Sequence, residues 1–267
     1  MRRVKKHYVD SIVYLNSQKA INKNIVTIQG TGFMLGIPDK NQSNNYSVFV
    51  VTCKHLLGDE KVEVIVNTRD GLNKVIITEL PDWKTDPVKD LAIYPLAYDE
   101  DLKNLFIRLD FDAFHGDMID RLNIGTGDEA YVLGRFINLE GDYKNQPICR
   151  SGIIAISTDE PIYNSYLEHG NPGYLLDLNI KKGFSGSPVF VQYENRIESS
   201  GSQKSDSWSG DRLIGIVWGG IDEEFPIKDH NNKDLPGAKV SILAGLIGVE
   251  PIKSIIDLIK NEFPDLF

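Results

Sequence analysis

Apolar residues gather in short runs, mostly of four to eight positions and rich in Val, Ile, Tyr and Phe, up to about residue 245. Clusters of Gly, Asn, Asp and Pro separate these runs. Short β-branched and aromatic segments bounded by turn formers predict strands. The predicted strands are Ile12–Leu15, Ile25–Ile28, Gly32–Leu35, Ser47–Thr52, Val62–Asn67, Lys74–Thr78, Leu91–Pro95, Glu129–Leu133, Ile148–Ile156, Tyr174–Asn179, Pro188–Tyr193, Leu213–Val217 and Ala238–Leu243.

Long helical patterns do not alternate with these runs, so the strand pattern favours a barrel or a sandwich over βαβ units. Two stretches differ from it. Glu194–Asp211 is polar and Ser-rich, which predicts a flexible hairpin tip between two apolar strands. Glu250–Phe263 has apolar residues at helical spacing, and Pro251 suits a first helical turn. We therefore expect a C-terminal amphipathic helix packed on the β body.

Charge and composition argue against several classes of protein. The 267-residue chain has 29 Lys and Arg against 38 Asp and Glu, a net charge of −9, and no basic tract, which argues against nucleic-acid binding. It has no run of about 20 apolar residues, and its basic start lacks the apolar region of a signal peptide. Two cysteines, Cys53 and Cys149, are too few for a disulfide scaffold or a four-cysteine zinc site. These features predict a cytoplasmic protein without a membrane partner.

Three short segments contain residues that suggest chemistry. His55 ends an apolar strand, Asp90 opens another, and Ser185 lies in a Gly-flanked turn within Lys182–Phe190. Taken singly, each has an ordinary structural explanation as a strand end, a turn former or a loop residue. Their joint occurrence in the order His, Asp, Ser favours a catalytic explanation.

Acyl transfer requires these residue types. A serine hydroxyl is a poor nucleophile until an imidazole takes its proton. A carboxylate on the other imidazole nitrogen fixes the tautomer and stabilises the imidazolium. The oxyanion that forms needs preorganised N–H donors. Gly183, two residues before Ser185, allows the backbone to turn so that two amides point at one spot, which makes the amides of Gly183 and Ser185 the candidate donors.

In these segments the chain resembles the chymotrypsin-like (trypsin-fold) serine peptidases, most of all their bacterial, disulfide-poor branch, which includes the HtrA-type catalytic domains. The resemblance spans roughly residues 25–245. The matching segments are Gly30-Thr31-Gly32-Phe33, Val51-Thr52-Cys53-Lys54-His55, Asp90-Leu91-Ala92 and Gly183-Phe184-Ser185-Gly186-Ser187-Pro188, and Leu213–Gly220 looks like the strand that lines the substrate cleft.

This resemblance implies an all-β fold of two packed six-stranded antiparallel β-barrels with a C-terminal α-helix. Residues 1–115 would form the barrel that carries the histidine and the aspartate, residues 116–247 the barrel that carries the serine, and residues 248–267 the helix. The two barrels would make one peptidase unit. By the same resemblance, His55 would be the general base, Asp90 its orienting carboxylate and Ser185 the nucleophile of a serine endopeptidase that cleaves polypeptides through an acyl-enzyme.

The chain departs from the family pattern at three positions. Cys53 stands in place of a small residue, and no cysteine lies upstream to pair with it. Phe184 stands where activated zymogens of the trypsin branch carry an aspartate that pairs with a new N-terminus. Activation by that route is therefore not expected, and the enzyme would be constitutive or gated in a different way. Ser187 replaces the second glycine, which the bacterial branch tolerates.

Few residues in the sequence indicate a substrate preference. Asn179, six residues before the proposed nucleophile, would lie near the base of the primary specificity pocket; its neutral side chain does not favour Arg or Lys. Gly219 and Gly220 would let a substrate backbone pair with the Ile216–Trp218 edge by strand addition. The ordinary alternatives are a strand-end role for Asn179 and a plain turn at the two glycines.

Other functions fit the sequence less well. An α/β-hydrolase would show Gly-x-Ser-x-Gly and the order Ser, Asp, His, but residue 187 is Ser and only His230 follows Ser185. Cys53 and His55 form the only close Cys/His pair, so no metal is expected. The Gly-Thr-Gly motifs lack the third glycine of a dinucleotide fold, so no cofactor is expected.

One alternative belongs to a different functional class. The same fold could serve as a catalytically silent or partner-gated trypsin-fold module that binds peptides or proteins. The presence of all three candidate triad residues argues against the silent form, since pseudoenzymes usually lose at least one of them.

Overall fold

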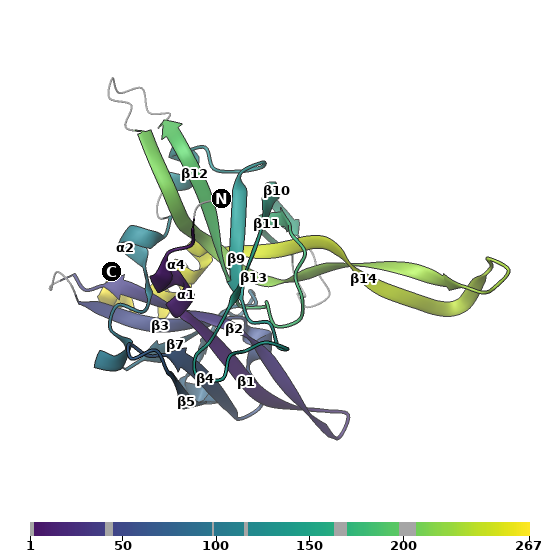
Figure 1. Ribbon diagram of the computed structural model, residues 1–267, viewed down its shortest axis with the longest axis horizontal. Coiled ribbons are helices and arrows are strands. Elements are labelled where there is room, and N and C mark those ends of the chain that lie inside the picture. Colours follow the sequence, from purple (N-terminus) through teal and green to yellow (C-terminus); the bar gives the residue numbers. More distant parts are fainter. Residues whose placement is uncertain (1–2, 41–44, 98, 115–116, 163–169, 198–206) are drawn as a thin grey trace.

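The computed structural model describes residues 3–40, 45–97, 99–114, 117–162, 170–197 and 207–267 (Figure 1). Every predicted strand overlaps a strand of the structure. The runs Ile25–Ile28 and Gly32–Leu35 belong to one continuous strand, because the intervening Gly30 and Thr31 keep extended pairing with the neighbouring strand. The centre of the predicted hairpin tip, residues 198–206, lies outside the described residues.

The first half of the chain forms one sheet in the order β5-β4-β1-β2-β3-β7-β6, with β8 paired to β2. All pairs are antiparallel except β2 with β8. Its strands are β1 (Ile12–Ile21), β2 (Asn24–Pro38), β3 (Tyr46–Thr52), β4 (Lys61–Asn67), β5 (Asn73–Glu79), β6 (Lys84–Thr85), β7 (Ala92–Leu96) and β8 (Ile107–Arg108).

The second half forms a closed antiparallel barrel in the order β10-β11-β14-β13-β12-β9. Its strands are β9 (Glu129–Gly134), β10 (Ile148–Ile162), β11 (Asn171–Asp177), β12 (Pro188–Ile197), β13 (Ser207–Lys228) and β14 (Asp234–Pro251). The predicted all-β architecture of two antiparallel halves is confirmed. In detail, the second half has the six strands expected of it, whereas the first is an eight-stranded sheet.

The helices are short. They are α1 (Lys6–Asp10), α2 (Leu109–Asp112), α3 (Met118–Arg121), α4 (Ile252–Glu262) and the 3-10 turns η1 (Lys54–Leu56), η2 (Leu80–Asp82), η3 (Glu100–Leu102) and η4 (Pro264–Leu266). Helix α4 confirms the predicted C-terminal amphipathic helix, and it begins directly after Pro251. Among the described residues, no helix has the length and apolar character needed to cross a membrane. The division at residues 115 and 247 stays a prediction.

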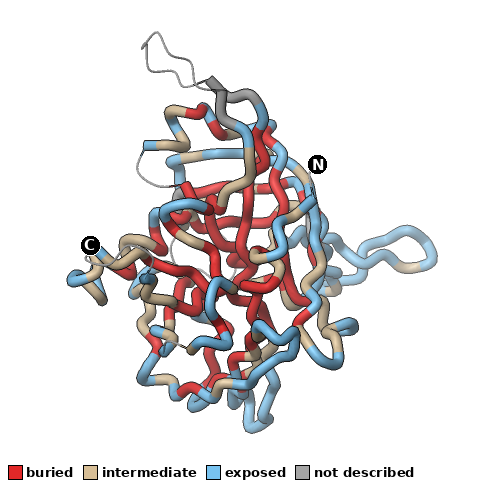
Figure 2. Tube along the Cα trace, turned by 60° about the vertical axis from the view of Figure 1, so that its left-hand side comes forward, coloured by how far each residue is buried: buried red, intermediate tan, exposed pale blue. Residues whose placement is uncertain are grey.

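The first sheet is buried on both faces. Ile12 and Tyr14 belong to one apolar cluster, whereas Val13 and Leu15 belong to another. Successive strand residues point to opposite faces, so this alternation separates the two clusters. The first cluster continues into the second barrel and α4, and buried backbone runs through both halves in Figure 2. One shared core therefore joins the two halves, and a second lies within the first half alone.

Segments near both ends of the chain cross between the halves. In α1, the Tyr8 ring stacks on Phe190 of β12 with the ring centroids 4.4 Å apart. After α4, the Phe263 ring lies 5.0 Å from the ring of Phe49 in β3. Helix α1 of the first half thus packs on the barrel, and the segment after α4 packs on the first sheet.

The buried carboxylate of Asp112 links α1 to α2 through hydrogen bonds. Its carboxylate accepts the Tyr8 hydroxyl at 3.0 Å, His7 Nε2 at 3.1 Å and the Arg108 backbone N–H at 3.1 Å. Burial by itself raises the pKa of Asp112. The hydrogen bonds from His7 and Arg108 and the charge of Lys5 outweigh burial and lower this pKa to about 2. A carboxyl with a depressed folded-state pKa stabilises the fold above its unfolded pKa, and that contribution is lost as the pH falls.

We expect Asp112→Asn to lower the free energy of unfolding at pH 7 by about 2 kcal/mol. The deficit should shrink between about pH 4 and pH 2, where the wild-type carboxyl also takes up its proton. Chemical denaturation at both ends of this range measures the difference. Asp117→Asn, at an exposed carboxylate paired with Arg121, is the control and should change little at either pH. A deficit of unchanged size at pH 2 would contradict the argument.

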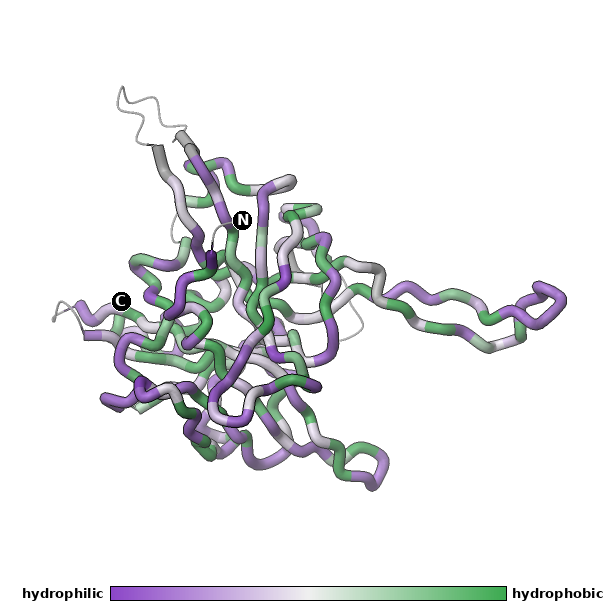
Figure 3. The backbone as a smooth tube through the Cα atoms, viewed as in Figure 1, coloured by the Kyte–Doolittle hydropathy of each residue, from purple (hydrophilic) through white to green (hydrophobic). Residues whose placement is uncertain are grey.

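Strands β13 and β14 extend beyond the barrel as a two-stranded arm, Asp222 to Leu243, seen at the right of Figure 1. The register pairs Phe225 with Val240 and Glu223 with Ile242, which places them on one face. The other face carries an ion pair between Glu224 and Lys239 at 2.6 Å. Figure 3 shows apolar and polar residues mixed along this arm. Phe225, Val240 and Ile242 are 46%, 42% and 52% exposed, so the apolar face of the arm is open to solvent.

Candidate active site

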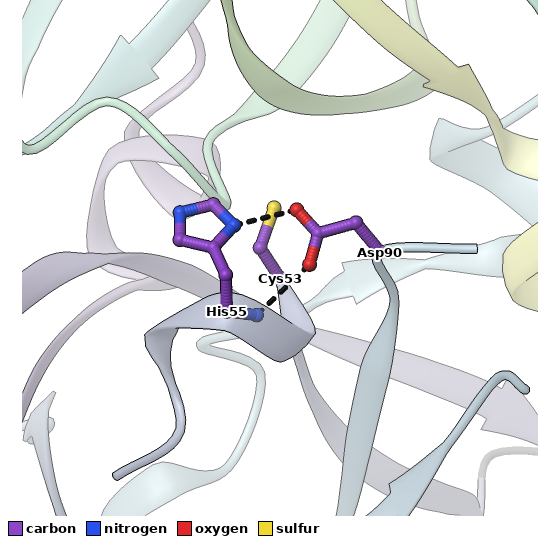
Figure 4. Close-up of side chains that lie close together, drawn as sticks. All are labelled: Cys53, His55 and Asp90. Atoms are coloured by element: carbon purple, nitrogen blue, oxygen red, sulfur yellow. Dashed lines mark hydrogen bonds and ion pairs between the residues drawn. The ribbon is translucent and has the colours of Figure 1, made fainter. Parts of the chain in front are cut away.

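His55 and Asp90 meet because two paired strands bring their ends together. His55 lies in η1, just after β3, and Asp90 lies just before β7. Strands β3 and β7 pair antiparallel, with Thr52 opposite Ala92. His55 Nδ1 is 2.5 Å from Asp90 Oδ2, and the His55 backbone N–H donates to Asp90 Oδ1 at 2.8 Å (Figure 4). Asp90 therefore holds both the imidazole and the backbone of the histidine.

The two side chains differ in exposure. The Asp90 side chain is 8% exposed and the His55 side chain 29%. A carboxylate removed from water strengthens its hydrogen bond to the imidazole, because the local dielectric is low. When Nδ1–H donates to this carboxylate, Nε2 is the imidazole nitrogen that can take up a proton. Such a pair is suited to act as a general base with an orienting carboxylate.

The loop before Asp90 is held by hydrogen bonds within the loop and by an ion pair to the second half of the chain. Asp86 Oδ1 accepts the backbone N–H of Val88 at 2.9 Å and that of Lys89 at 2.8 Å. Lys89 Nζ lies 3.1 Å from Glu250 Oε1, and Glu250 is buried near the end of β14. This ion pair joins the Asp90 loop to the second half of the chain.

Ser185 lies in the turn that leads into β12, and this turn packs against the first sheet. Gly183 and Gly186 take left-handed φ angles of 101° and 83°, a conformation that favours glycine. The Ser185 carbonyl accepts the Thr31 N–H at 2.9 Å. A Cβ at Gly186 would lie 1.8 Å from the Thr31 carbonyl oxygen. The structure thus places Ser185 at the seam between the halves.

The Val217 carbonyl joins the His55 segment to the Ser185 turn. It accepts the Cys53 Sγ–H at 3.2 Å from one side and the Gly186 N–H at 2.8 Å from the other. Cys53 precedes His55 by two residues, and Gly186 follows Ser185. The segments that carry the two residues therefore meet at one acceptor on β13.

Cys53, His55 and Asp90 also form the one group of three possible metal-ligating side chains in the described parts of the chain; their ligand atoms lie within 4.8 Å of one another. Zinc binds cysteine as the thiolate. Burial and then the nearby charge of Asp90 raise the pKa of Cys53, so its thiol keeps the proton that it donates to Val217. His55 and Asp90 are engaged with each other. This donor set suits a hydrogen-bonded relay better than a metal centre.

The other predicted site residues have different surroundings. Asn179 is exposed, directly after β11 and Leu178. Trp218 is 3% exposed and its ring covers Gly248, where a Cβ would lie 1.6 Å from a ring atom. Gly219 and Gly220 lie within β13, opposite Gly248 and Ile247, so the alternative of a plain turn at these glycines is wrong. The pairing register shifts on both sides of the two glycines.

Arg135 is a residue near the site that the sequence did not single out. It follows β9, and its side chain is buried to 1% exposure. Nη1 donates to the Leu15 carbonyl at 2.8 Å, and Nη2 lies 2.8 Å from Glu140 Oε1. No local pattern marks an arginine after a strand as buried, because two of its acceptors, the Leu15 carbonyl and Asn16 Oδ1, come from the other half of the chain.

Comparison with known proteins gives structural matches only. No protein-family model matches the chain, and no curated protein matches it in sequence. Among solved structures, it is similar to Deg5 (14% identity, TM-score 0.47, 93% of this chain and 87% of that one). It is also similar to the active form of the Rv3671c protease from Mycobacterium tuberculosis, with 16% identity and a TM-score of 0.48 over 94% of this chain and 80% of that one. A mutant of tobacco etch virus protease is similar with 12% identity and a TM-score of 0.48 over 99% of this chain and 83% of that one. The strand order of this chain, an eight-stranded sheet followed by a closed six-stranded barrel, fits a double-barrel, chymotrypsin-like fold.

Proposed function

We propose that the chain is a serine endopeptidase that uses Ser185 as nucleophile, His55 as general base and Asp90 as the carboxylate that orients it. The observation that carries the proposal is the His55–Asp90 pair, with its 2.5 Å contact, at a seam where the Ser185 turn is also docked. The components of an activated nucleophile are thus supplied by two halves of one chain.

The proposed reaction has two stages. Ser185 Oγ attacks the scissile carbonyl carbon while its proton passes to His55 Nε2. The tetrahedral intermediate then collapses: the C–N bond breaks, His55 returns the proton to the leaving amine, and an ester to Ser185 remains. Water repeats the sequence on that ester and restores the free serine. Asp90 stays ionised throughout and stabilises the imidazolium.

The proposed oxyanion hole consists of the backbone N–H groups of Gly183 and Ser185. The left-handed φ of Gly183 supports it, because this conformation lets neighbouring amides converge on one point. The expected substrate is a polypeptide that adds as a strand beside Trp218–Gly220 of β13. Asn179 would give the primary pocket a neutral polar group. An activating partner protein belongs to the alternative function, a partner-gated module.

Labelling with a fluorophosphonate probe tests the proposal. The serine oxygen attacks phosphorus and fluoride leaves, so intact mass should show one adduct on the wild-type protein. The adduct should be absent from Ser185→Ala and His55→Ala. Ser187→Ala is the matched control: it removes a neighbouring buried hydroxyl that has no hydrogen-bond partner among the described atoms, and it should keep the adduct.

The absence of an adduct on the folded wild-type protein would overturn the assignment and favour a silent or partner-gated module. An adduct that persists in Ser185→Ala would show that another nucleophile reacts. A single Ser185 adduct would justify screening a peptide library for the preferred residue at the cut.

A further inference from the structure

We propose that Thr31 is a positioning residue that holds the Gly183–Ser185 turn in the shape required by the proposed function, on which this inference rests. Thr31 lies in β2 and is fully buried at the seam between the two halves. It belongs to the Gly-Thr-Gly-Phe segment that precedes the His55 strand. No part of the reaction scheme uses its hydroxyl, so its buried polar contacts need another explanation.

All the polar groups of Thr31 are engaged, and three of its four contacts reach the second half. Its hydroxyl donates to the Gly183 carbonyl at 2.6 Å and accepts the Arg135 N–H at 2.9 Å. Its backbone N–H donates to the Ser185 carbonyl at 2.9 Å. Its own carbonyl accepts the Thr52 hydroxyl at 2.8 Å, one strand away and three residues before His55.

These contacts fix the orientation of consecutive peptide planes. Thr31 holds the carbonyls of Gly183 and Ser185, and the Ser187 N–H holds the Phe184 carbonyl between them at 3.0 Å. Because the N–H and C=O of one peptide point in opposite directions, holding the Phe184 carbonyl also aims the Ser185 N–H. Thr31 therefore braces the turn on both sides of the peptide that supplies one proposed oxyanion donor.

The brace is itself anchored in the first half. Arg135, which donates to the Thr31 hydroxyl, has its side chain bound to the Leu15 carbonyl and to Asn16 Oδ1, each at 2.8 Å. The Thr31 carbonyl continues the network to β3 through Thr52. Strand β3, which ends just before His55, thus also supports the Ser185 turn through Thr52 and Thr31.

The test compares Thr31→Val with Thr31→Ser. Valine matches threonine in shape but removes the hydroxyl, and so leaves the Gly183 carbonyl and the Arg135 N–H without this partner. Serine keeps the hydroxyl. Thr78→Val is the control, because Thr78 is also buried and its hydroxyl also both donates and accepts a hydrogen bond. It donates to the Val62 carbonyl and accepts Trp83 Nε1–H, and both partners lie within the first half.

We expect Thr31→Val to slow fluorophosphonate labelling and to lower kcat by about tenfold to a hundredfold, with little change in KM. Thr31→Ser should recover most of the rate, and Thr78→Val should label at the wild-type rate even if its melting temperature falls. Amide exchange, which needs no activity, should be faster at Gly183–Gly186 in Thr31→Val alone.

Wild-type labelling in Thr31→Val, or equal loss in Thr31→Val and Thr78→Val, would overturn the inference while leaving the proposed function in place. Failure of Thr31→Ser to recover the rate would also show that the hydroxyl is not what matters. If wild-type protein is never labelled, the proposed function fails first, and the positioning role falls with it. Unchanged exchange at residues 183–186 in Thr31→Val would show that the turn does not need this brace.

Discussion

Replacing Asp90 by Asn should lower kcat/KM for peptide hydrolysis on the order of 10⁴-fold. The substitution preserves shape, so the fold should persist. The effect comes from the proton on the imidazole. An asparagine at 2.5–2.8 Å from His55 can present an N–H to Nδ1, which places the imidazole proton on Nε2, where it cannot accept one from Ser185.

The measurement is single-turnover hydrolysis of a peptide that the wild-type protein cleaves, beside thermal unfolding of both proteins. Asp86→Asn is the matched control, because Asp86 lies in the same loop and its carboxylate accepts the backbone N–H groups of Val88 and Lys89, a role that an asparagine side-chain oxygen can fill. Its rate should stay near the wild-type value. Turnover of Asp90→Asn within tenfold of the wild type would refute the role given to the carboxylate.

Gly186→Ala should both destabilise the protein and abolish labelling of Ser185. The new Cβ would lie 1.8 Å from the Thr31 carbonyl oxygen and 2.6 Å from the Thr52 hydroxyl. Neither a strand backbone nor a buried hydrogen-bonded threonine can move far. The turn must therefore shift, and we expect the free energy of unfolding to fall by about 3 kcal/mol or more.

Gly71→Ala separates this clash from backbone strain. Gly71 has a φ of 86° against 83° for Gly186, but a Cβ there would meet nothing within 4 Å. Gly71→Ala should cost only about 1–2 kcal/mol for the left-handed conformation and should label normally. Denaturant titration and intact mass of both variants give the comparison. Equal destabilisation and equal labelling would mean that the seam at Gly186 is not tightly closed.

The sequence predicted the parts of the fold and site that local patterns encode. The strand runs, α4 and the motifs of His55, Asp90 and Ser185 each depend on neighbours a few residues away. It is the pairing of β3 with β7 that converts two such motifs into the His55–Asp90 contact. The strand pattern indicated both segments, but only their register brings the two side chains together.

Features that depend on distant partners were not predictable in this way. No strand is predicted between Val217 and Ala238, because Asp222, Glu223 and Pro226 break the alternation of apolar residues. The arm forms through the ladder between β13 and β14. The buried Arg135 has an acceptor in the Leu15 carbonyl, 120 residues earlier in the chain. Such pairings depend on the topology of the fold and cannot be predicted from a short stretch of sequence.

Segments near both ends of the chain contact the opposite half, so a newly made chain can form the seam between the halves only when both segments are present. Tyr8 binds the Asp211 carbonyl, 203 residues later, and Lys89 binds Ser254, 165 residues later. Synthesis proceeds from the N-terminus at about 5–20 residues per second, so His55 and Asp90 leave the ribosome well before the strands that complete their surroundings. Contacts of such high sequence separation also form slowly. A nascent chain therefore remains without the assembled seam until the segment up to Ser254 has been made.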